Sequence, residues 1–98
     1  MDDISSETVR PVVEWILKEN MYPKKERVSQ LVLVIESAGG ELSSLWCLVD
    51  IMNGSKIPVD TVGIGTVASA GFMAFITGKH KILTPNTTIM SHQYSEEM

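Results

Sequence analysis

The chain has 98 residues, of which 44% are hydrophobic and 20% charged, and its formal net charge is −4. This length predicts a single domain over residues 1–98, and the apolar fraction is too high for a disordered chain. The negative charge and the scattered Lys and Arg residues argue against nucleic-acid binding, and no apolar run approaches the roughly 18 residues that cross a bilayer, so no membrane segment is expected.

The first predicted element is an amphipathic helix over residues 5–19. Apolar side chains recur there at the i, i+3, i+4 spacing that places them on one helix face: Val9, Val12, Val13, Ile16 and Leu17. Pro11 has no N–H, so it is expected near the first turn of the helix, where no intrahelical hydrogen bond is lost. The polar and charged residues 20–30 are predicted to form a solvated connection.

A strand and a second helix are predicted next. Residues 31–35 form an uninterrupted apolar run, which is typical of a parallel strand covered on both faces. Gly39 and Gly40 then break the chain, and a helix is predicted from about residue 41 to residue 53. Cys47 is expected in or near the core, beside an inner stripe that consists of Leu42, Leu45, Trp46, Val49 and Met52.

The last part of the chain continues the alternation. Residues 61–67 predict a second buried strand, residues 70–77 a short apolar helix closed by Gly78, and residues 81–83 and 88–90 two short strands around a turn. Strands that alternate with helices indicate an α/β fold with right-handed crossovers.

Two strand-to-helix junctions are the candidate sites for chemistry: Ser37-Ala38-Gly39-Gly40 and Ala68-Ser69-Ala70-Gly71. In a parallel α/β sheet the carboxyl ends of neighbouring strands face one edge, where sites collect. Helix N-termini there present backbone N–H groups that have no partner within the helix. One junction could hold a nucleophile, and together they could supply two N–H donors to an oxyanion.

A serine nucleophile needs a base, and the chain has two histidines. His80 lies between two lysines in a turn and is expected to be solvated, whereas His92 follows a strand and could reach the edge that holds Ser69. Spacing alone is weak support, because Ser at a helix start is far more often a cap than a nucleophile. A His at a strand end is likewise more often a surface or packing residue.

Four motifs together resemble a known family. They are Ser37-Ala38-Gly39-Gly40, Ala68-Ser69-Ala70-Gly71, Leu83-Thr84-Pro85-Asn86 and Met90-Ser91-His92-Gln93. In this order and spacing, over roughly residues 2–94, the chain resembles the proteolytic subunit of the Clp protease, ClpP. Any one of these motifs would be unspecific, whereas the combination is quite specific.

The resemblance implies a fold and a mechanism. Family members fold as a crotonase-like spiral of β-β-α units with a mostly parallel sheet, which this chain would hold incomplete at both ends. Ser69 would be the nucleophile of a serine endopeptidase and His92 its general base. The backbone N–H groups of Gly40 and Ala70 would form the oxyanion hole.

The resemblance also implies partners. Family members assemble into two stacked seven-membered rings, and an ATP-driven AAA+ unfoldase feeds unfolded polypeptides to the enclosed active sites. ATP would bind that partner, so we expect no cofactor on this chain, which has no phosphate loop and no metal-ligand spacing. The single cysteine and the acidic, polar N-terminus indicate a cytoplasmic protein without a signal or transit peptide.

The chain departs from the family pattern at two motif positions and at the residue after the last motif. The family usually has Pro where this chain has Ala38, often has Met in place of Ala70, and commonly has Pro in place of Tyr94. Ala38 keeps the turn possible but makes it less rigid. The exchange of Met for Ala70 should leave the backbone N–H at this position able to act as a donor.

The triad acid is the larger departure. The family places an Asp far downstream of His92, as well as a long handle helix that interlocks the rings, and this sequence ends at Met98. Asp50 and Asp60 are weak alternatives, because Asp50 is expected at a solvent edge and Asp60 at the far end of a strand from Ser69. The length is therefore interpreted as the front part of a longer protein.

Two other functions stay open. A non-catalytic ClpP-like subunit, kept for assembly or regulation, is favoured by the missing acid and opposed by the presence of both Ser69 and His92. An acyl-CoA enzyme of the crotonase type ranks last. It uses a related spiral and paired N–H groups but needs no Ser or His at these positions.

Overall fold

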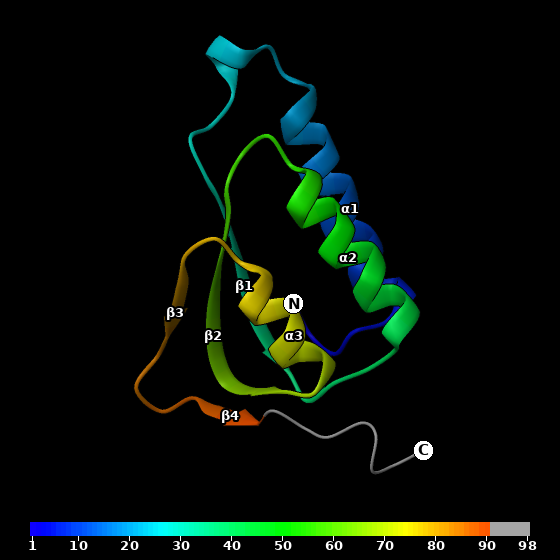
Figure 1. The fold of residues 1–98 in the computed structure, drawn as a ribbon, viewed down its shortest axis with the longest axis vertical. Helices are drawn as coiled ribbons and strands as arrows, with labels where there is room; N and C mark the ends of the chain where they lie inside the picture. The colour runs from blue at the N-terminus through cyan, green and yellow to red at the C-terminus, as the bar shows by residue number, and fades with distance from the viewer. Residues whose placement is uncertain (91–98) are drawn as a thin grey trace.

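Three helices and four strands alternate along the chain in this computed structural model, which describes residues 1–90 (Figure 1). The elements are α1 (Ser6–Met21), a 3-10 turn (Lys24–Glu26), β1 (Leu31–Ser37), α2 (Leu42–Gly54), β2 (Val59–Ala68), α3 (Ala70–Thr77), β3 (Lys81–Leu83) and β4 (Thr88–Met90). Every predicted element is present, and the helix over residues 70–77 has the predicted bounds.

The sheet is built around β2. β1 pairs with β2 in parallel from Leu31↔Val59 onwards, and β3 and β4 pair in parallel with two different segments of β2. β3 lies beside residues 61–63 and β4 beside residues 66–68. All pairings of the named strands are therefore parallel, which confirms the predicted α/β class with a mostly parallel sheet.

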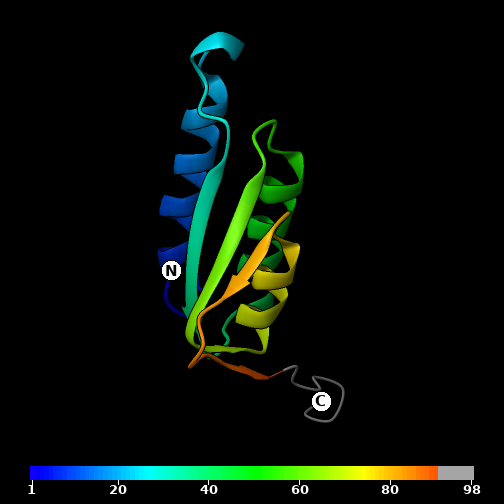
Figure 2. The same cartoon turned by 90° about the vertical axis from the view of Figure 1, so that its left-hand side faces the viewer.

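The helices lie together on one side of this sheet, as the two views agree (Figures 1 and 2). Along β1, burial alternates strictly, so that Leu33 and Ile35 face the helices while Val32 and Val34 are exposed. The prediction that this strand is covered on both faces is wrong for residues 1–90. The run is apolar on both faces, but helices pack on only one of them.

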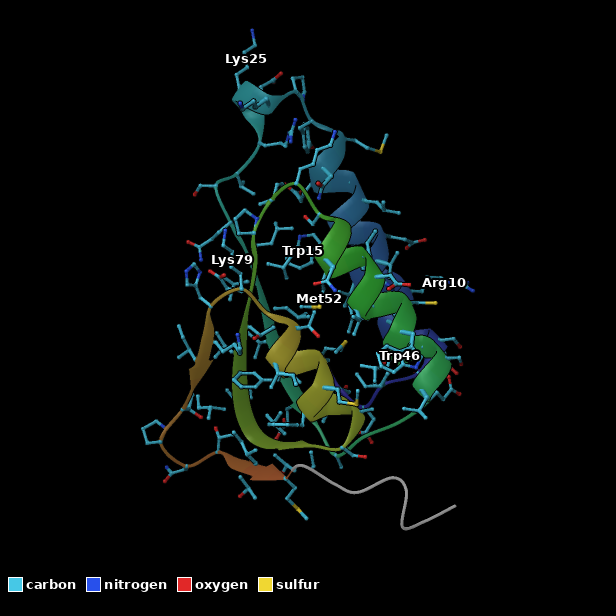
Figure 3. All side chains as sticks on the ribbon, in the orientation of Figure 1. Arg10, Trp15, Lys25, Trp46, Met52 and Lys79 are labelled. Atoms are coloured by element: carbon cyan, nitrogen blue, oxygen red, sulfur yellow. The ribbon has the colours of Figure 1, made fainter. Side chains whose placement is uncertain are left out.

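The core lies between the sheet and the helices. Its largest fully buried apolar side chains are Ile4, Ile16, Ile35, Leu45, Leu48 and Val67. α2 is turned so that Ser44, Leu45, Leu48 and Met52 face inward, at the spacing of one helix face. The predicted inner stripe is therefore wrong for Leu42 and for Trp46 (labelled in Figure 3), which are exposed. Cys47 is exposed as well.

The start of α1 is fixed by a capping box. The Ser5 hydroxyl accepts the Thr8 N–H, and the Thr8 hydroxyl accepts the Ser5 N–H. The helix begins at Ser6, which places Pro11 in the second turn rather than near the first as predicted. Pro11 and Glu7 are both exposed, so water can satisfy the Glu7 carbonyl that loses its intrahelical donor.

A bulge bends β2 near its carboxyl end. The register shifts between Ile35↔Gly63 and Ser37↔Val67, and Gly65 in the extra stretch has φ +60°. A glycine adopts this backbone conformation without strain. Beyond the bulge, the last residues of β2 pair with β4 and lead into the junction with α3 (Figure 1).

Candidate active site

Ser69 lies at a sharp turn between β2 and α3. Its backbone has φ +56° and ψ −125°, a region that a residue with a Cβ occupies at a cost of about 1–3 kcal/mol. Ser69 holds the N-cap position of α3, yet its side chain makes no capping hydrogen bond. The ordinary interpretation, a serine that caps a helix, therefore does not hold. The strained turn instead resembles the strand-to-helix elbow that presents the nucleophile in α/β-hydrolase folds.

Neighbouring elements hold Ser69 in this conformation. Its N–H donates to the Met90 carbonyl oxygen of β4 (3.1 Å), and its carbonyl oxygen accepts the Met73 N–H of α3 (3.2 Å). Both backbone groups are thus paired, on opposite sides of the turn. This pairing over-determines the backbone and can maintain a strained conformation.

The two predicted junctions meet at Gly71 and Ser37. A Cβ added to Gly71, in the first turn of α3, would lie 2.6 Å from the Ser37 Cβ and 2.8 Å from the Ser37 carbonyl oxygen. Ser37 is the last residue of β1 and is buried. Only a glycine lets α3 approach the end of β1 this closely, and this contact brings the Ser69 turn beside the Gly39-Gly40 turn.

Gly39 and Gly40 both have positive φ values, +141° and +147°. The Ile4 N–H donates to the Gly39 carbonyl oxygen (2.8 Å), and the Glu41 N–H donates to the Ile4 carbonyl oxygen (2.8 Å). The Gly39 carbonyl and the Gly40 N–H belong to one trans peptide, in which they point in opposite directions. The Gly40 N–H therefore points away from Ile4.

The second candidate donor is the N–H of Ala70. Ala70 is the first residue of α3, so its N–H has no acceptor within the helix. This second donor lies close to Gly39, the residue that precedes the first donor, Gly40. A Cβ at Gly39 would lie 3.4 Å from the Ser69 Oγ and 3.9 Å from the Ala70 nitrogen. The arrangement brings a serine hydroxyl, a helix N-terminus and a glycine turn to one place.

A comparison with known proteins identifies the family. The Clp protease family profile matches residues 3–98. The chain belongs to the Clp protease family. It is 29% identical over 77 residues to an ATP-dependent Clp protease proteolytic subunit 2 of Treponema pallidum, a match that covers 78% of this chain and 39% of the relative.

A solved structure of the family has the same fold. The ClpP protease catalytic domain from Plasmodium falciparum superposes with a TM-score of 0.83 at 27% sequence identity. The match covers 99% of this chain and 55% of that structure's chain. The chain thus spans less than two thirds of the length of either Clp protease relative.

The histidine and acid expected in a Clp protease triad are placed as follows. His92 lies outside the described residues. Met90 of β4, which is two residues before His92 in the sequence, accepts the Ser69 N–H with its carbonyl oxygen. Asp60 lies at the start of β2, at the opposite end from Ser69, where it binds Gln30 (2.6 Å) and the ring of His80 (2.9 Å). Asp50 is exposed on α2.

A polar network that no sequence pattern predicts lies behind the glycine turn. The Asp3 carboxylate accepts the Ala38 N–H (2.9 Å) and lies 3.4 Å from the Ser37 Oγ, which itself accepts the Gly39 N–H (3.2 Å). A cavity of about 430 Å³ opens beside this network and is lined in part by Asp3 and Ser37. Asp3 is 34 residues from Ser37 in sequence, so no local pattern could have revealed the contact.

Neither a metal site nor a membrane helix is found in the described part of the chain. Among residues 1–90, no three His, Cys, Asp or Glu side chains lie in an arrangement that could hold a metal ion. No helix in the same range has the length and hydropathy that a bilayer span requires.

Proposed function

We propose that this chain forms the nucleophile and oxyanion-hole part of a serine endopeptidase that hydrolyses peptide bonds of unfolded proteins. The observation that carries the proposal is Ser69 in a strained strand-to-helix turn, where it does not cap the helix and lies against Gly39. Membership of the Clp protease family supports the reaction class.

The mechanism follows from the proposed roles. Ser69 Oγ attacks the peptide carbonyl carbon while His92 takes its proton, and the negative charge that forms on the carbonyl oxygen is stabilised by the N–H groups of Gly40 and Ala70. His92 then gives the proton to the leaving amine, and an acyl-enzyme remains on Ser69. Water activated by His92 hydrolyses the acyl-enzyme in the second half of the reaction.

A carboxylate would orient His92 and stabilise its protonated form. Loss of this group typically lowers turnover by about 10⁴-fold, while nucleophile and oxyanion donors retain residual activity. Asp60 is unsuited to the role because its carboxylate is engaged at the other end of β2. We therefore propose that the acid comes from outside these 98 residues.

We also propose that the chain works in a ring assembly in the cytoplasm. The family resemblance suggests two stacked seven-membered rings, fed by an AAA+ unfoldase that uses ATP, with no cofactor on this chain. The exposed apolar face of the sheet, which includes Val32, Val34 and Ile82, supports burial against other subunits.

A fluorophosphonate probe tests the catalytic proposal directly, because it reacts with an activated serine. We expect labelling of the assembled protein on Ser69, complete loss of the label in Ser69→Ala, and unchanged labelling in the control Ser43→Ala, an exposed serine on α2. Absence of labelling in a folded, assembled sample would refute the catalytic role. It would then favour the second candidate, a non-catalytic ClpP-like subunit.

An acyl-CoA enzyme of the crotonase type is the remaining alternative. Such an enzyme would use the paired N–H groups of Gly40 and Ala70 to polarise a thioester carbonyl and would not need Ser69. Acyl-CoA turnover that persists in Ser69→Ala would support it. Probe labelling that is lost in the same variant would exclude it.

A further inference from the structure

We propose that residues 3–4 act as a clamp that fixes the orientation of the Gly39-Gly40 peptide, with the Asp3 carboxylate as a positioning residue for the oxyanion hole. The inference rests on the proposed function, because it assigns a reason for holding this peptide. Asp3 touches no reacting atom in the mechanism above. It acts through the backbone of residues 37–39.

Ile4 supplies the first half of the clamp. Its N–H holds the Gly39 carbonyl oxygen, and its carbonyl oxygen holds the Glu41 N–H, so both sides of Gly40 are tied to one buried residue. A flip of the Gly39-Gly40 peptide would break the bond from Ile4 and turn the Gly40 N–H towards it. The orientation of the proposed oxyanion donor is therefore set by a residue 36 positions earlier in the sequence.

Asp3 supplies the second half. One carboxylate oxygen, Oδ1, accepts the Ala38 N–H at 2.9 Å and lies 3.4 Å from the Ser37 Oγ. The Ser37 hydroxyl accepts the Gly39 N–H at 3.2 Å and lies 3.1 Å from the Gly39 carbonyl oxygen. Asp3 thus restrains the turn before Gly39 directly at Ala38 and indirectly through Ser37.

The start of α1 holds the clamp in place. The Thr8 hydroxyl donates to the Asp3 carbonyl oxygen (2.5 Å) and belongs to the capping box with Ser5. The helix N-terminus also favours a negative charge nearby. Asp3 is therefore held by its backbone and presents its carboxylate to the turn.

The residue type at position 38 makes the hydrogen bond from the Ala38 N–H to Asp3 important for the turn. Ala38 carries a backbone N–H and a flexible φ, whereas the proline that the family resemblance leads us to expect at this position would carry neither. The bond from the Ala38 N–H to Asp3 restrains the same turn non-covalently. A charge-assisted hydrogen bond of this kind is stronger than one between neutral groups.

Asp3→Ala, Asp3→Asn and the control Asp2→Ala test the proposal in the assembled protein. Asp2 is an exposed neighbour that also lines the cavity beside the network. In Asp3→Ala we expect amide hydrogen exchange at Ala38 and Gly39 to rise at least tenfold, with exchange in the middle of β2 unchanged. Asp3→Asn retains a side-chain oxygen acceptor, so it should keep most of the protection, and Asp2→Ala should change nothing.

The second readout is the kinetics of fluorophosphonate labelling. An oxyanion donor acts in the transition state, so Asp3→Ala should lower the maximal labelling rate about tenfold and leave the half-saturating probe concentration unchanged. A merely structural role would reduce the active fraction instead of this rate. Asp3→Asn should restore most of the rate.

A double-mutant cycle with Ala38→Pro isolates the contact. Proline removes the Ala38 N–H, so Asp3→Ala should have little further effect on labelling in that background. Unchanged exchange at Ala38 and Gly39 in Asp3→Ala, or faster exchange throughout the sheet, would overturn the clamp. If the unmodified protein is not labelled, the proposed function fails, and the exchange measurement still decides the clamp.

Discussion

Gly39 lies directly against Ser69: a Cβ at Gly39 would lie 3.1 Å from the Ser69 Cβ and 3.4 Å from its Oγ. The space beside the proposed nucleophile is therefore kept open by the absence of a side chain. The backbone conformation of Gly39 also favours glycine at this position, because residues with a side chain rarely adopt its φ of +141°.

Gly39→Ala should consequently impair labelling of Ser69 more than it impairs folding. The added methyl group would push on the serine hydroxyl and strain the turn that leads to Gly40. We expect the labelling rate to fall at least tenfold, measured with the fluorophosphonate probe on samples of verified secondary structure. Gly54→Ala is the control, since a Cβ there meets nothing within 4 Å. Equal labelling of the two variants would contradict the proposed role of Gly39.

Gly71→Ala should destabilise the protein, although alanine favours helices. The propensity gain is about 1 kcal/mol, whereas forcing a methyl group into the Ser37 backbone and Cβ costs typically about 1–3 kcal/mol. We expect a net loss in the free energy of unfolding, measured by urea denaturation. In contrast, Gly54→Ala should stabilise by up to about 1 kcal/mol, because it adds no contact. A stabilised Gly71→Ala variant would mean that α3 can move away from β1.

Asp60→Ala should lower stability and leave labelling of Ser69 unchanged. The buried Asp60 carboxylate accepts hydrogen bonds from Gln30 and from the His80 backbone N–H, so its removal should cost about 1–3 kcal/mol. His80→Ala should cost less than about 1 kcal/mol, because the His80 side chain is 70% exposed. Urea denaturation and probe kinetics separate the two effects. A selective fall in the labelling rate of Asp60→Ala would reinstate it as a candidate triad acid.

The elements of the fold were largely predictable because each has a local signal. Apolar periodicity predicted α1, and the small residues at both junctions predicted where strands give way to helices. Local patterns do not encode what covers a face, so the exposure of Val32, Val34 and Trp46 was not foreseen. The direction in which α2 faces depends on its packing against α1 and α3, which no single helix pattern determines.

The residues of the candidate site could likewise be predicted from the sequence only in part. Ser69 and Gly40 were proposed from junction spacing together with a family resemblance, and the strained turn of Ser69 had no sequence signal beyond its position. The contacts from Asp3 and Ile4 join residues more than 30 positions apart, so only the folded chain shows them. His92 remains a prediction, since it lies outside residues 1–90.

The open face of the sheet, defined here by Val32, Val34, Val62 and Ile82, should drive association between chains. Val34, Val62 and Ile82 are in register across β1, β2 and β3, and Ile82 is 57% exposed. Burying such a continuous apolar surface favours association by about 25 cal/mol per Å². Val34→Thr combined with Ile82→Thr keeps β-branched side chains and should therefore weaken self-association without a large change in the urea midpoint.

Sedimentation velocity over a concentration series measures this effect. We expect the unmodified chain to associate with rising concentration, and the double variant to require a concentration at least tenfold higher. Leu17→Gln is the matched control, because Leu17 is a comparably exposed apolar side chain on α1, away from the open face. If Leu17→Gln weakens association as much as the double variant does, the helices rather than the sheet form the contact between chains.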